Sequence, residues 1–321
     1  MNYLGKFVIA VAFVGFTSSV SARNFSGLYI FGDSLSDPGN LALVIGTEPD
    51  QIITGNDYVP NKPYASGQLT NGDVWATTFA HDIGLGAFSA PALAGGGNFA
   101  FGGARASLDG ANRPPSLIAQ QDLFLQRNNG VAPNDALYVL QSGGNDARDA
   151  LEQILAGSPA ETVIETAAAQ YAQSLGVMVD QLQSAGAHRI VIWNVPNIGQ
   201  APALTHFGPQ VSSAGEQVAL AMNDALSDRM SLEPGVSIFD DFSLVTQAIM
   251  NPADYGLTNV TDACGATSAC DPSSYLFWDG LHPTSAGHAL LAQHMVQLIP
   301  EPATYALLLA GLLVVGIKIR N

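Results

Sequence analysis

Short apolar runs that alternate with longer helical stretches are the feature of this sequence that most constrains its fold. The runs are rich in aliphatic and aromatic residues and are punctuated by glycine, proline and serine. They cover residues 28–31, 98–101, 136–140, 189–195 and 236–239. Buried parallel strands have this character, because helices cover both faces of a parallel sheet.

Helical stretches lie between these runs and after the last of them. We predict helices over residues 162–185, 213–232 and 286–298, the first of them ended by Gly186 as a C-cap. Strands that alternate with helices predict an α/β sandwich with a parallel sheet. Active sites in such sheets lie beyond the carboxyl ends of the strands, so catalytic residues should follow strands directly.

The first 22 residues indicate a secretory signal peptide. Lys6 precedes an almost wholly apolar stretch, residues 7–16, and small residues follow at 20–22. This order predicts export, with cleavage after Ala22. The alternative is a transmembrane anchor, for which the stretch is short compared with a span of ~20 residues.

The last residues, 299–321, form a separate tail. Pro300-Glu301-Pro302 precedes an apolar run, residues 306–317, and the chain then carries Lys318 and Arg320. We predict a transmembrane segment with its basic end in the cytoplasm, since a final amphipathic helix would not be apolar on all faces. The layout resembles the PEP-CTERM sorting signals of Gram-negative bacteria. That resemblance implies an exosortase-type partner, membrane attachment before processing, and a place in the cell envelope or outside the cell.

The remaining residues, 23–298, have the size of one domain. The formal net charge of −16 argues against a nucleic-acid partner, because phosphate binding needs lysine and arginine. The two cysteines, Cys264 and Cys270, are close in sequence and predict a small-loop disulfide in an oxidising compartment. A metal site is the weaker alternative, since no histidine lies near them in sequence.

Ser34 directly follows the first predicted strand, where a turn would expose its hydroxyl. A serine needs a base to become a nucleophile. His282 lies three residues after Asp279 in one predicted turn, so the carboxylate could hold one ring nitrogen while the other faces the serine. The other histidines, which lack an acidic residue in such a position, are His81, His188, His206, His288 and His294. The alternative for Ser34 is a helix cap.

Candidate donors for an oxyanion follow three different predicted strands. They are the N–H of Ser34, an N–H of the glycine pair at residues 102–103, and the side-chain amide of Asn145. Each of these residue types is also common in turns, which is the alternative for each one taken alone. Together they occupy the positions at which a parallel sheet places its active site.

Four sequence blocks resemble the GDSL, or SGNH, hydrolase superfamily, in family order. They are Phe31-Gly32-Asp33-Ser34-Leu35-Ser36-Asp37, Asn98-Phe99-Ala100-Phe101-Gly102-Gly103-Ala104, Gly143-Gly144-Asn145-Asp146 and Asp279-Gly280-Leu281-His282-Pro283-Thr284. The resemblance implies a three-layer α/β/α sandwich, flavodoxin-like, with no metal or cofactor. It implies Ser34 as nucleophile, His282 as base, Asp279 as its orienting partner, and Ser34, Gly103 and Asn145 as the oxyanion hole.

The expected activity is hydrolysis of carboxylic esters of the esterase or lipase type. The ester substrate could be a lipid, a small ester or an acylated sugar. Alternatives are a polysaccharide O-deacetylase, an acyltransferase and a non-catalytic surface-binding module. We predict long loops over residues 41–71 and 196–208, the first beside the cleft. An apolar groove there would favour lipid esters, and a polar groove with exposed aromatics such as Tyr58 and Tyr64 would favour sugars.

Overall fold

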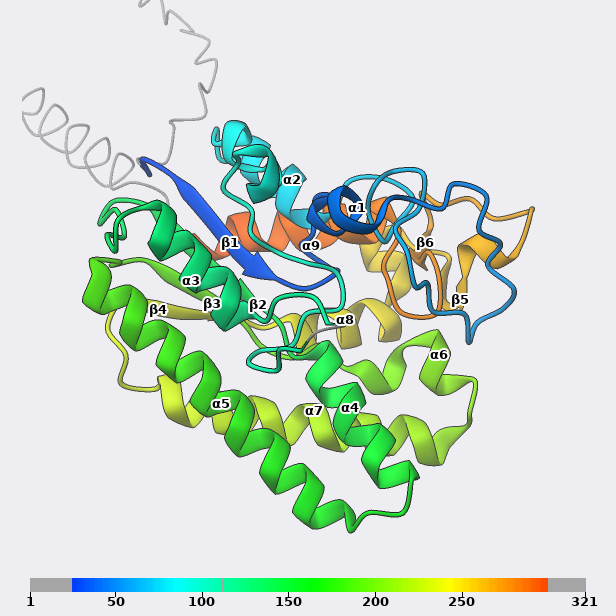
Figure 1. The fold of residues 1–321 in the computed structure, drawn as a ribbon. Helices are drawn as coiled ribbons and strands as arrows, with labels where there is room; N and C mark the ends of the chain where they lie inside the picture. Colours follow the sequence, from blue (N-terminus) through cyan, green and yellow to red (C-terminus); the bar gives the residue numbers. More distant parts are fainter. Residues whose placement is uncertain (1–24, 111–112, 300–321) are drawn as a thin grey trace, which may run out of the picture. The chain divides into compact units, whose positions relative to one another are not determined.

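A four-stranded parallel sheet forms the centre of the chain (Figure 1). The computed structural model describes residues 25–110 and 113–299. Its central strands, hydrogen-bonded in chain order, are β1 (Leu28–Gly32), β2 (Leu137–Gln141), β3 (Ile190–Trp193) and β4 (Val236–Phe239). A separate two-stranded parallel sheet consists of β5 (Asn259–Ala263) and β6 (Tyr275–Phe277).

The predicted strand over residues 98–101 is wrong, because this segment forms only isolated bridges at Asn98, one with Ile30 of β1 and one with Pro91. It lies along the edge of β1 away from β2: Ile30 N donates to Gly97 O at 3.1 Å and Phe99 N to Ile30 O at 2.7 Å. Glycine-containing turns on both sides, at residues 95–97 and 102–103, end the pairing early. With this segment included, the spatial order is the flavodoxin-like 2-1-3-4-5.

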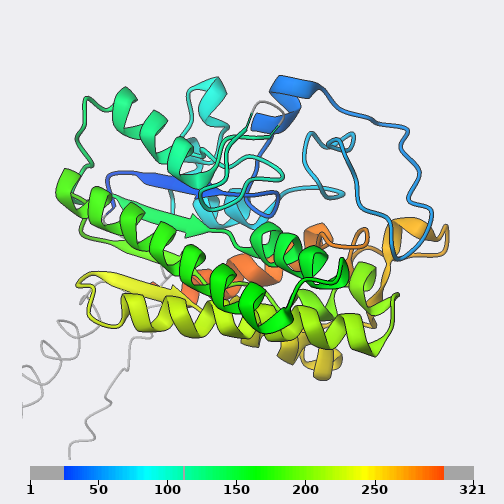
Figure 2. The same ribbon diagram turned by 60° about the horizontal axis from the view of Figure 1, so that its bottom comes forward.

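Nine helices are found in the described part of the chain. They are α1 (Asn40–Ile45), α2 (Trp75–Asp82), α3 (Leu117–Arg127), α4 (Gly144–Leu155), α5 (Ala160–Ala185), α6 (Pro202–Thr205), α7 (Pro209–Met230), α8 (Asp241–Met250) and α9 (Ser285–Leu298). Helices α3, α4, α5 and α7 cover one face of the sheet, and α2, α8 and α9 cover the other (Figures 1 and 2). The fold is therefore the expected three-layer α/β/α sandwich.

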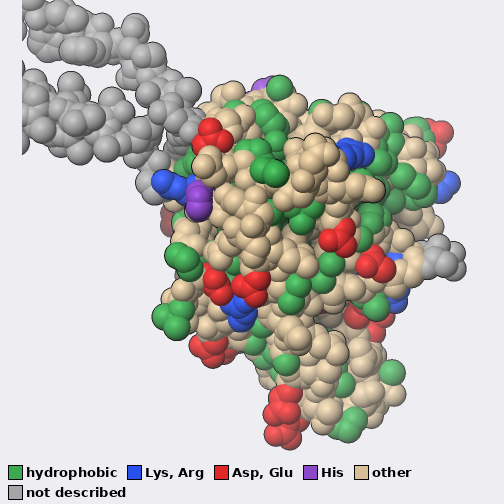
Figure 3. All heavy atoms as spheres, turned by 60° about the vertical axis from the view of Figure 1, so that its left-hand side comes forward, with side chains coloured by type: hydrophobic (Ala, Val, Ile, Leu, Met, Phe, Trp, Pro, Cys, Tyr) green, Lys and Arg blue, Asp and Glu red, His purple; other side chains and the backbone are tan. Residues whose placement is uncertain are grey.

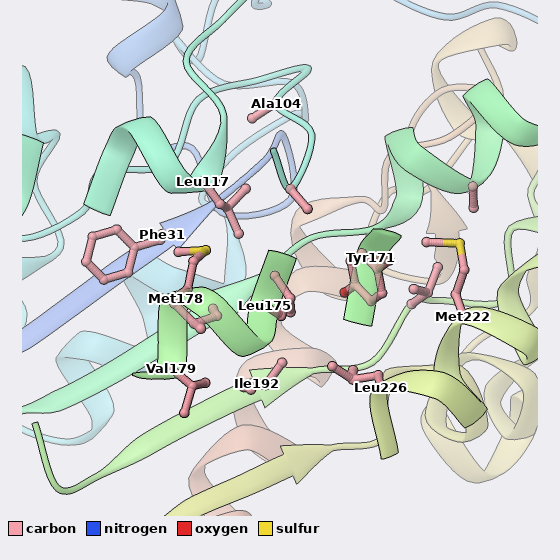
Figure 4. Close-up of a cluster of buried hydrophobic side chains, with 14 of the residues drawn as sticks. Phe31, Ala104, Leu117, Tyr171, Leu175, Met178, Val179, Ile192, Met222 and Leu226 are labelled. Atoms are coloured by element: carbon pink, nitrogen blue, oxygen red, sulfur yellow. The ribbon is translucent and has the colours of Figure 1, made fainter. Parts of the chain in front are cut away.

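Side chains alternate between the two faces of the sheet. Leu140 and Ile192 pack in the cluster beneath α5 and α7, part of which Figure 4 shows, whereas Val139 and Val191 pack against α2 and α9. Successive strand residues point to opposite faces. Because both faces are covered, both sets are apolar, and the strands appear in the sequence as continuous apolar runs.

Sequence and structure agree closely on the three predicted helices. The predicted helix over 162–185 is α5, and Gly186 follows it with a left-handed φ of 117°. The predicted loops are partly wrong, because residues 41–71 overlap α1 and residues 196–208 contain α6. Both helices are short, at 6 and 4 residues, and lack the apolar periodicity by which a helix is recognised.

The predicted signal peptide and the tail from residue 300 onward lie outside the described residues. Within residues 25–110 and 113–299, no helix combines the length and apolarity needed to cross a membrane. On the face in Figure 3, acidic side chains (red) and basic side chains (blue) lie in small separate groups among uncharged ones.

Cys264 and Cys270 are joined by a disulfide just after β5, with their Cα atoms 5.3 Å apart.

Candidate active site

Ser34 lies on a tight turn that begins where β1 ends. The N–H groups of Ser36 and Asp37 donate to Asp33 O at 3.1 and 3.0 Å, and Leu35 N donates to Asp33 Oδ1 at 3.0 Å. Burial raises the pKa of Asp33 to about 6. Ser34 does not cap α1, which starts six residues later at Asn40.

Hydrogen bonds of buried polar side chains hold this turn in place. Ser36 Oγ donates to Gln141 Oε1 at 2.7 Å and accepts from Trp75 Nε1 at 3.0 Å. Gln120 bonds both backbone groups of Gly32, each at 2.9 Å. Trp75, Gln120 and Gln141 were not predicted from the sequence, because each lies far along the chain from Ser34.

Ser34, His282 and Asp279 form one hydrogen-bonded line. Ser34 Oγ lies 3.0 Å from His282 Nε2, and His282 Nδ1 lies 3.0 and 2.9 Å from the two carboxylate oxygens of Asp279. Asp279 Oδ1 also accepts from the N–H groups of Leu281 and His282, each at 2.8 Å. The turn that carries Asp279 and His282 therefore fixes its own carboxylate.

Tyr64 adds a contact that the sequence did not predict. Its hydroxyl donates to Asp279 Oδ2 at 2.9 Å, and its ring meets Trp278 edge-on at a centroid distance of 6.0 Å. Burial and the neighbouring Asp279 raise the pKa of Tyr64, so the phenol keeps its proton. Tyr64 is not one of the exposed aromatic side chains that would favour a sugar substrate, since only 6% of it is exposed.

His288, in α9, is the other histidine close to this line. Only 1% of it is exposed, and neither ring nitrogen has a hydrogen-bond partner in the described chain. Burial, with His282 nearby, lowers the pKa of His288 to about 3, so its ring stays neutral. Of the histidines compared in the sequence, His282 is the one that reaches Ser34.

The glycine pair has two distinct roles. Gly102 N donates to Asp37 Oδ2 at 2.8 Å, so this N–H is occupied. Gly103 N has no partner among the described residues, and Gly103 borders the cavity beside Ser34 with a left-handed φ of 82°. Gly103 is therefore the member of the pair with an N–H free for a ligand.

Helix α4 holds the segment that follows Gly103. Arg105 forms a two-pronged ion pair with Asp149 at 2.9 and 2.6 Å, and its third nitrogen donates to Gly103 O at 2.7 Å. Asn145 Nδ2 donates to Ala104 O at 3.0 Å, which leaves one amide hydrogen free. These contacts turn the Gly103 carbonyl toward Arg105 and fix the Asn145 amide at the cavity.

A cavity of about 240 Å³ opens beside these groups. Ser34, Gly103, Asn145 and His282 border it. Most of its remaining wall is apolar and includes Val59, Leu69, Ile198, Val245, Phe277 and Leu291. Two of these residues come from the stretch 41–71, so this part of the chain borders the cavity, as expected. In the described residues, no group of three or more His, Cys, Asp and Glu side chains is arranged to hold a metal ion.

This geometry is one that can carry out acyl transfer: a serine within reach of a histidine that a carboxylate orients, beside unoccupied N–H donors. A family model described as GDSL-like Lipase/Acylhydrolase matches residues 28–295. The chain belongs to this family. The residues that carried the resemblance in the sequence all lie within the matched range.

Named relatives come from bacteria and plants. Esterase EstA of Pseudomonas aeruginosa is 29% identical over 88% of this chain and 48% of its own length. A GDSL esterase/lipase of Arabidopsis thaliana is 25% identical over 92% of this chain and 96% of its own. The chain spans about half the length of the curated relatives it matches first. A solved structure of a lipolytic protein of the G-D-S-L family from Veillonella parvula DSM 2008 is 13% identical, with a TM-score of 0.46, over 85% of this chain and 97% of that one.

Proposed function

We propose that this chain is a serine hydrolase of carboxylic esters, with Ser34 as nucleophile, His282 as base and Asp279 as its orienting partner. The observation that carries the proposal is the 3.0 Å distance between Ser34 Oγ and His282 Nε2. A base must lie within hydrogen-bond reach of the proton it removes. The carboxylate on the far side of the ring holds the tautomer whose Nε2 can accept that proton.

The reaction then proceeds in two halves, the formation of an acyl-enzyme and its hydrolysis. His282 Nε2 removes the Ser34 proton as Oγ attacks the ester carbonyl, and the alcohol leaves with that proton as the tetrahedral intermediate collapses to an acyl-enzyme. Water attacks the acyl-enzyme and gives one proton to His282, and the second tetrahedral intermediate then releases the acid as His282 returns that proton to Ser34 Oγ. If an alcohol takes the place of water, the same steps give acyl transfer.

The N–H groups of Ser34 and Gly103 and the free amide hydrogen of Asn145 would stabilise the oxyanion. All three residues border the same cavity, and neither backbone N–H has a partner in the described structure. Donors that are held in place before the reaction need no reorganisation when charge develops. We expect Asn145→Ala to lower kcat by about 10²–10³, the usual loss for one such donor.

The cavity wall favours esters with an apolar acyl group over acetylated polysaccharide. Val59, Leu69, Val245, Phe277 and Leu291 offer apolar contact, whereas Tyr64, the aromatic expected to contact a sugar, is buried against Trp278. The cavity volume of about 240 Å³ is below the ~300–1,000 Å³ of sites for drug-sized ligands. We therefore expect better turnover of short-chain than of long-chain esters.

The test is hydrolysis of p-nitrophenyl esters, from acetate to palmitate, by the wild type and by Ser34→Ala. We expect activity in the wild type, with an optimum below the long-chain end, and loss of activity in Ser34→Ala. Equal activity of both proteins would show that Ser34 is not the nucleophile. No activity on any of these esters would favour the deacetylase or the surface-binding module, which acetylated polysaccharide would then distinguish.

We also propose that the hydrolase domain works outside the cytoplasm of a Gram-negative cell. The support is the order of charged, apolar and small residues in positions 1–22 and of the Pro-Glu-Pro motif, apolar run and basic end in positions 300–320. Mass spectrometry of the mature protein from cell fractions would test this. Expected ends are Arg23 at the N-terminus and, after sorting, a C-terminus that lacks the apolar run.

A further inference from the structure

Asp241 is a buried carboxyl group that no other described residue satisfies. It is the first residue of α8, it is 1% exposed, and it borders the same cavity as Ser34 and His282. Its Oδ1 atom is buried and lacks a hydrogen-bond partner in the described structure. Most buried polar groups in proteins have a partner, so this carboxyl is an exception that needs an explanation.

Asn197 has the same property on the same cavity. It follows β3, it is 2% exposed, and its Oδ1 atom is buried and lacks a partner among the described residues. Its Nδ2 makes only long contacts, at 3.3 Å to Glu216 Oε1 and 3.4 Å to Thr246 Oγ1. Two unsatisfied oxygen-bearing side chains therefore border a cavity with a mostly apolar wall.

The chemistry of these two groups suits an uncharged ligand. Burial raises the pKa of Asp241 to about 8, with the nearby Asp240 and Asp33 acting in the same direction. A carboxyl that is neutral near pH 7 can donate one hydrogen bond and accept others, and an amide oxygen accepts. A water molecule or a hydroxyl group of a substrate can accept a hydrogen bond from the first group and donate one to the second.

We propose that Asp241 and Asn197 form a subsite for a hydroxyl group of the ester substrate. This inference rests on the proposed esterase function, because it assigns part of the same cavity. The hydroxyl can belong to the acyl chain or to the alcohol half of the ester. In either case the pair determines specificity: it favours a hydroxylated ester over its unsubstituted analogue, which leaves both oxygen-bearing groups unpaired.

The test uses two matched pairs of esters. In the first, p-nitrophenyl butyrate is compared with p-nitrophenyl 3-hydroxybutyrate, so the hydroxyl is on the acyl side. In the second, propyl butyrate is compared with glycerol monobutyrate, so the hydroxyl is on the alcohol side. The measured quantity is the ratio of kcat/KM within each pair, which cancels any general loss of active enzyme in a variant.

We expect the wild type to favour the hydroxylated ester of one pair by about tenfold, as for one well-formed hydrogen bond. Asp241→Leu should bring this ratio to about one, and Asp241→Asn, which still donates and accepts, should keep part of it. Asp254→Asn is the matched control: it makes the same change on an exposed aspartate shortly after α8, which does not border the cavity. It should keep the wild-type ratio. If Asp241→Leu does not fold, Asn197→Ala gives the same comparison.

Ratios of about one for both pairs in the wild type would overturn the subsite while leaving the esterase function intact. A ratio that persists in Asp241→Leu and in Asn197→Ala would also overturn it. If the wild type hydrolyses none of the four esters, both the proposed function and the subsite that rests on it are wrong.

Discussion

Two buried aspartates border the reaction centre, and they differ in almost everything except burial. Asp279 is 0% exposed, and its carboxylate meets two backbone N–H groups, the Tyr64 hydroxyl and the His282 ring. Asp241 is 1% exposed and has no such donor. Burial alone disfavours a charge, and hydrogen-bond donors restore it. The comparison therefore separates a carboxyl group surrounded by hydrogen-bond partners from one without them among the described residues, whose pKa burial raises to about 8.

The largest expected effect is the difference between two single variants, one with asparagine in place of Asp279 and one with asparagine in place of Asp241. Asp279→Asn keeps the size of the side chain but removes the charge that holds the His282 tautomer, so kcat should fall by about 10³–10⁴. Asp241→Asn should reduce turnover of unsubstituted esters far less. The measurement is steady-state hydrolysis of p-nitrophenyl butyrate by both variants. Similar losses in both would remove the functional distinction between the two carboxyl groups.

A smaller effect is expected when one donor to Asp279 is removed. Tyr64→Phe deletes the hydroxyl and keeps the ring on Trp278, so kcat/KM should fall by about tenfold, as for one hydrogen bond to a charged group. Steady-state hydrolysis of p-nitrophenyl butyrate by the wild type and by Tyr64→Phe measures this loss.

The control for Tyr64→Phe is Tyr58→Phe, in the same stretch of chain. The Tyr58 hydroxyl donates to Gln51 Oε1 at 2.9 Å and does not reach Asp279. Tyr58→Phe should leave kcat/KM unchanged. If the two variants behave alike, Tyr64 contributes only to the stability of this stretch and not to the orientation of Asp279.

The last expected effect is on stability rather than on turnover, and it concerns Asp241. The pKa of Asp241 is about 8 in the folded protein and about 4 in an unfolded chain, so the folded state holds the extra proton between these values. Its contribution to the free energy of unfolding is therefore complete below about pH 4 and is lost as pH rises toward 8.

Asparagine at position 241 mimics the neutral acid at every pH. We expect the stability of Asp241→Asn, relative to wild type, to rise with pH by about 1 kcal/mol per pH unit at most, between pH 5 and 8. Urea unfolding at several pH values measures this. Asp33 and Asp146, whose pKa values burial raises to about 6 and about 7, act in the same direction in both proteins and cancel in the difference. A constant difference would show that Asp241 is charged in the folded state.

Patterns local in sequence predicted most of the fold. The strands at 28–32, 137–141, 190–193 and 236–239 are apolar because helices cover both faces of the sheet, and that burial is visible in the sequence. The segment 98–101 has the same composition but forms only isolated bridges at Asn98, one with Ile30 of β1 and one with Pro91, and composition does not reveal how far a pairing extends along the chain.

The predicted site residues were found because each follows a strand or shares a turn. Ser34 follows β1, and Asp279 and His282 are three residues apart. Tyr64 and Asp241 were missed for a physical reason. The direction of a side chain in a long loop, or at the first residue of a helix, is set by tertiary contacts such as that of Tyr64 with Trp278, and local spacing does not encode these.

The hydrogen bond from Tyr64 to Asp279 has a consequence for how relatives of this protein can diverge. The stretch 41–71 supplies both wall residues, such as Val59 and Leu69, and a donor to Asp279. Grafting this stretch from another family member would therefore exchange substrate preference and catalytic rate in a single step. A graft that keeps a phenol at position 64 would separate the two traits, and a library for directed evolution should hold that position fixed.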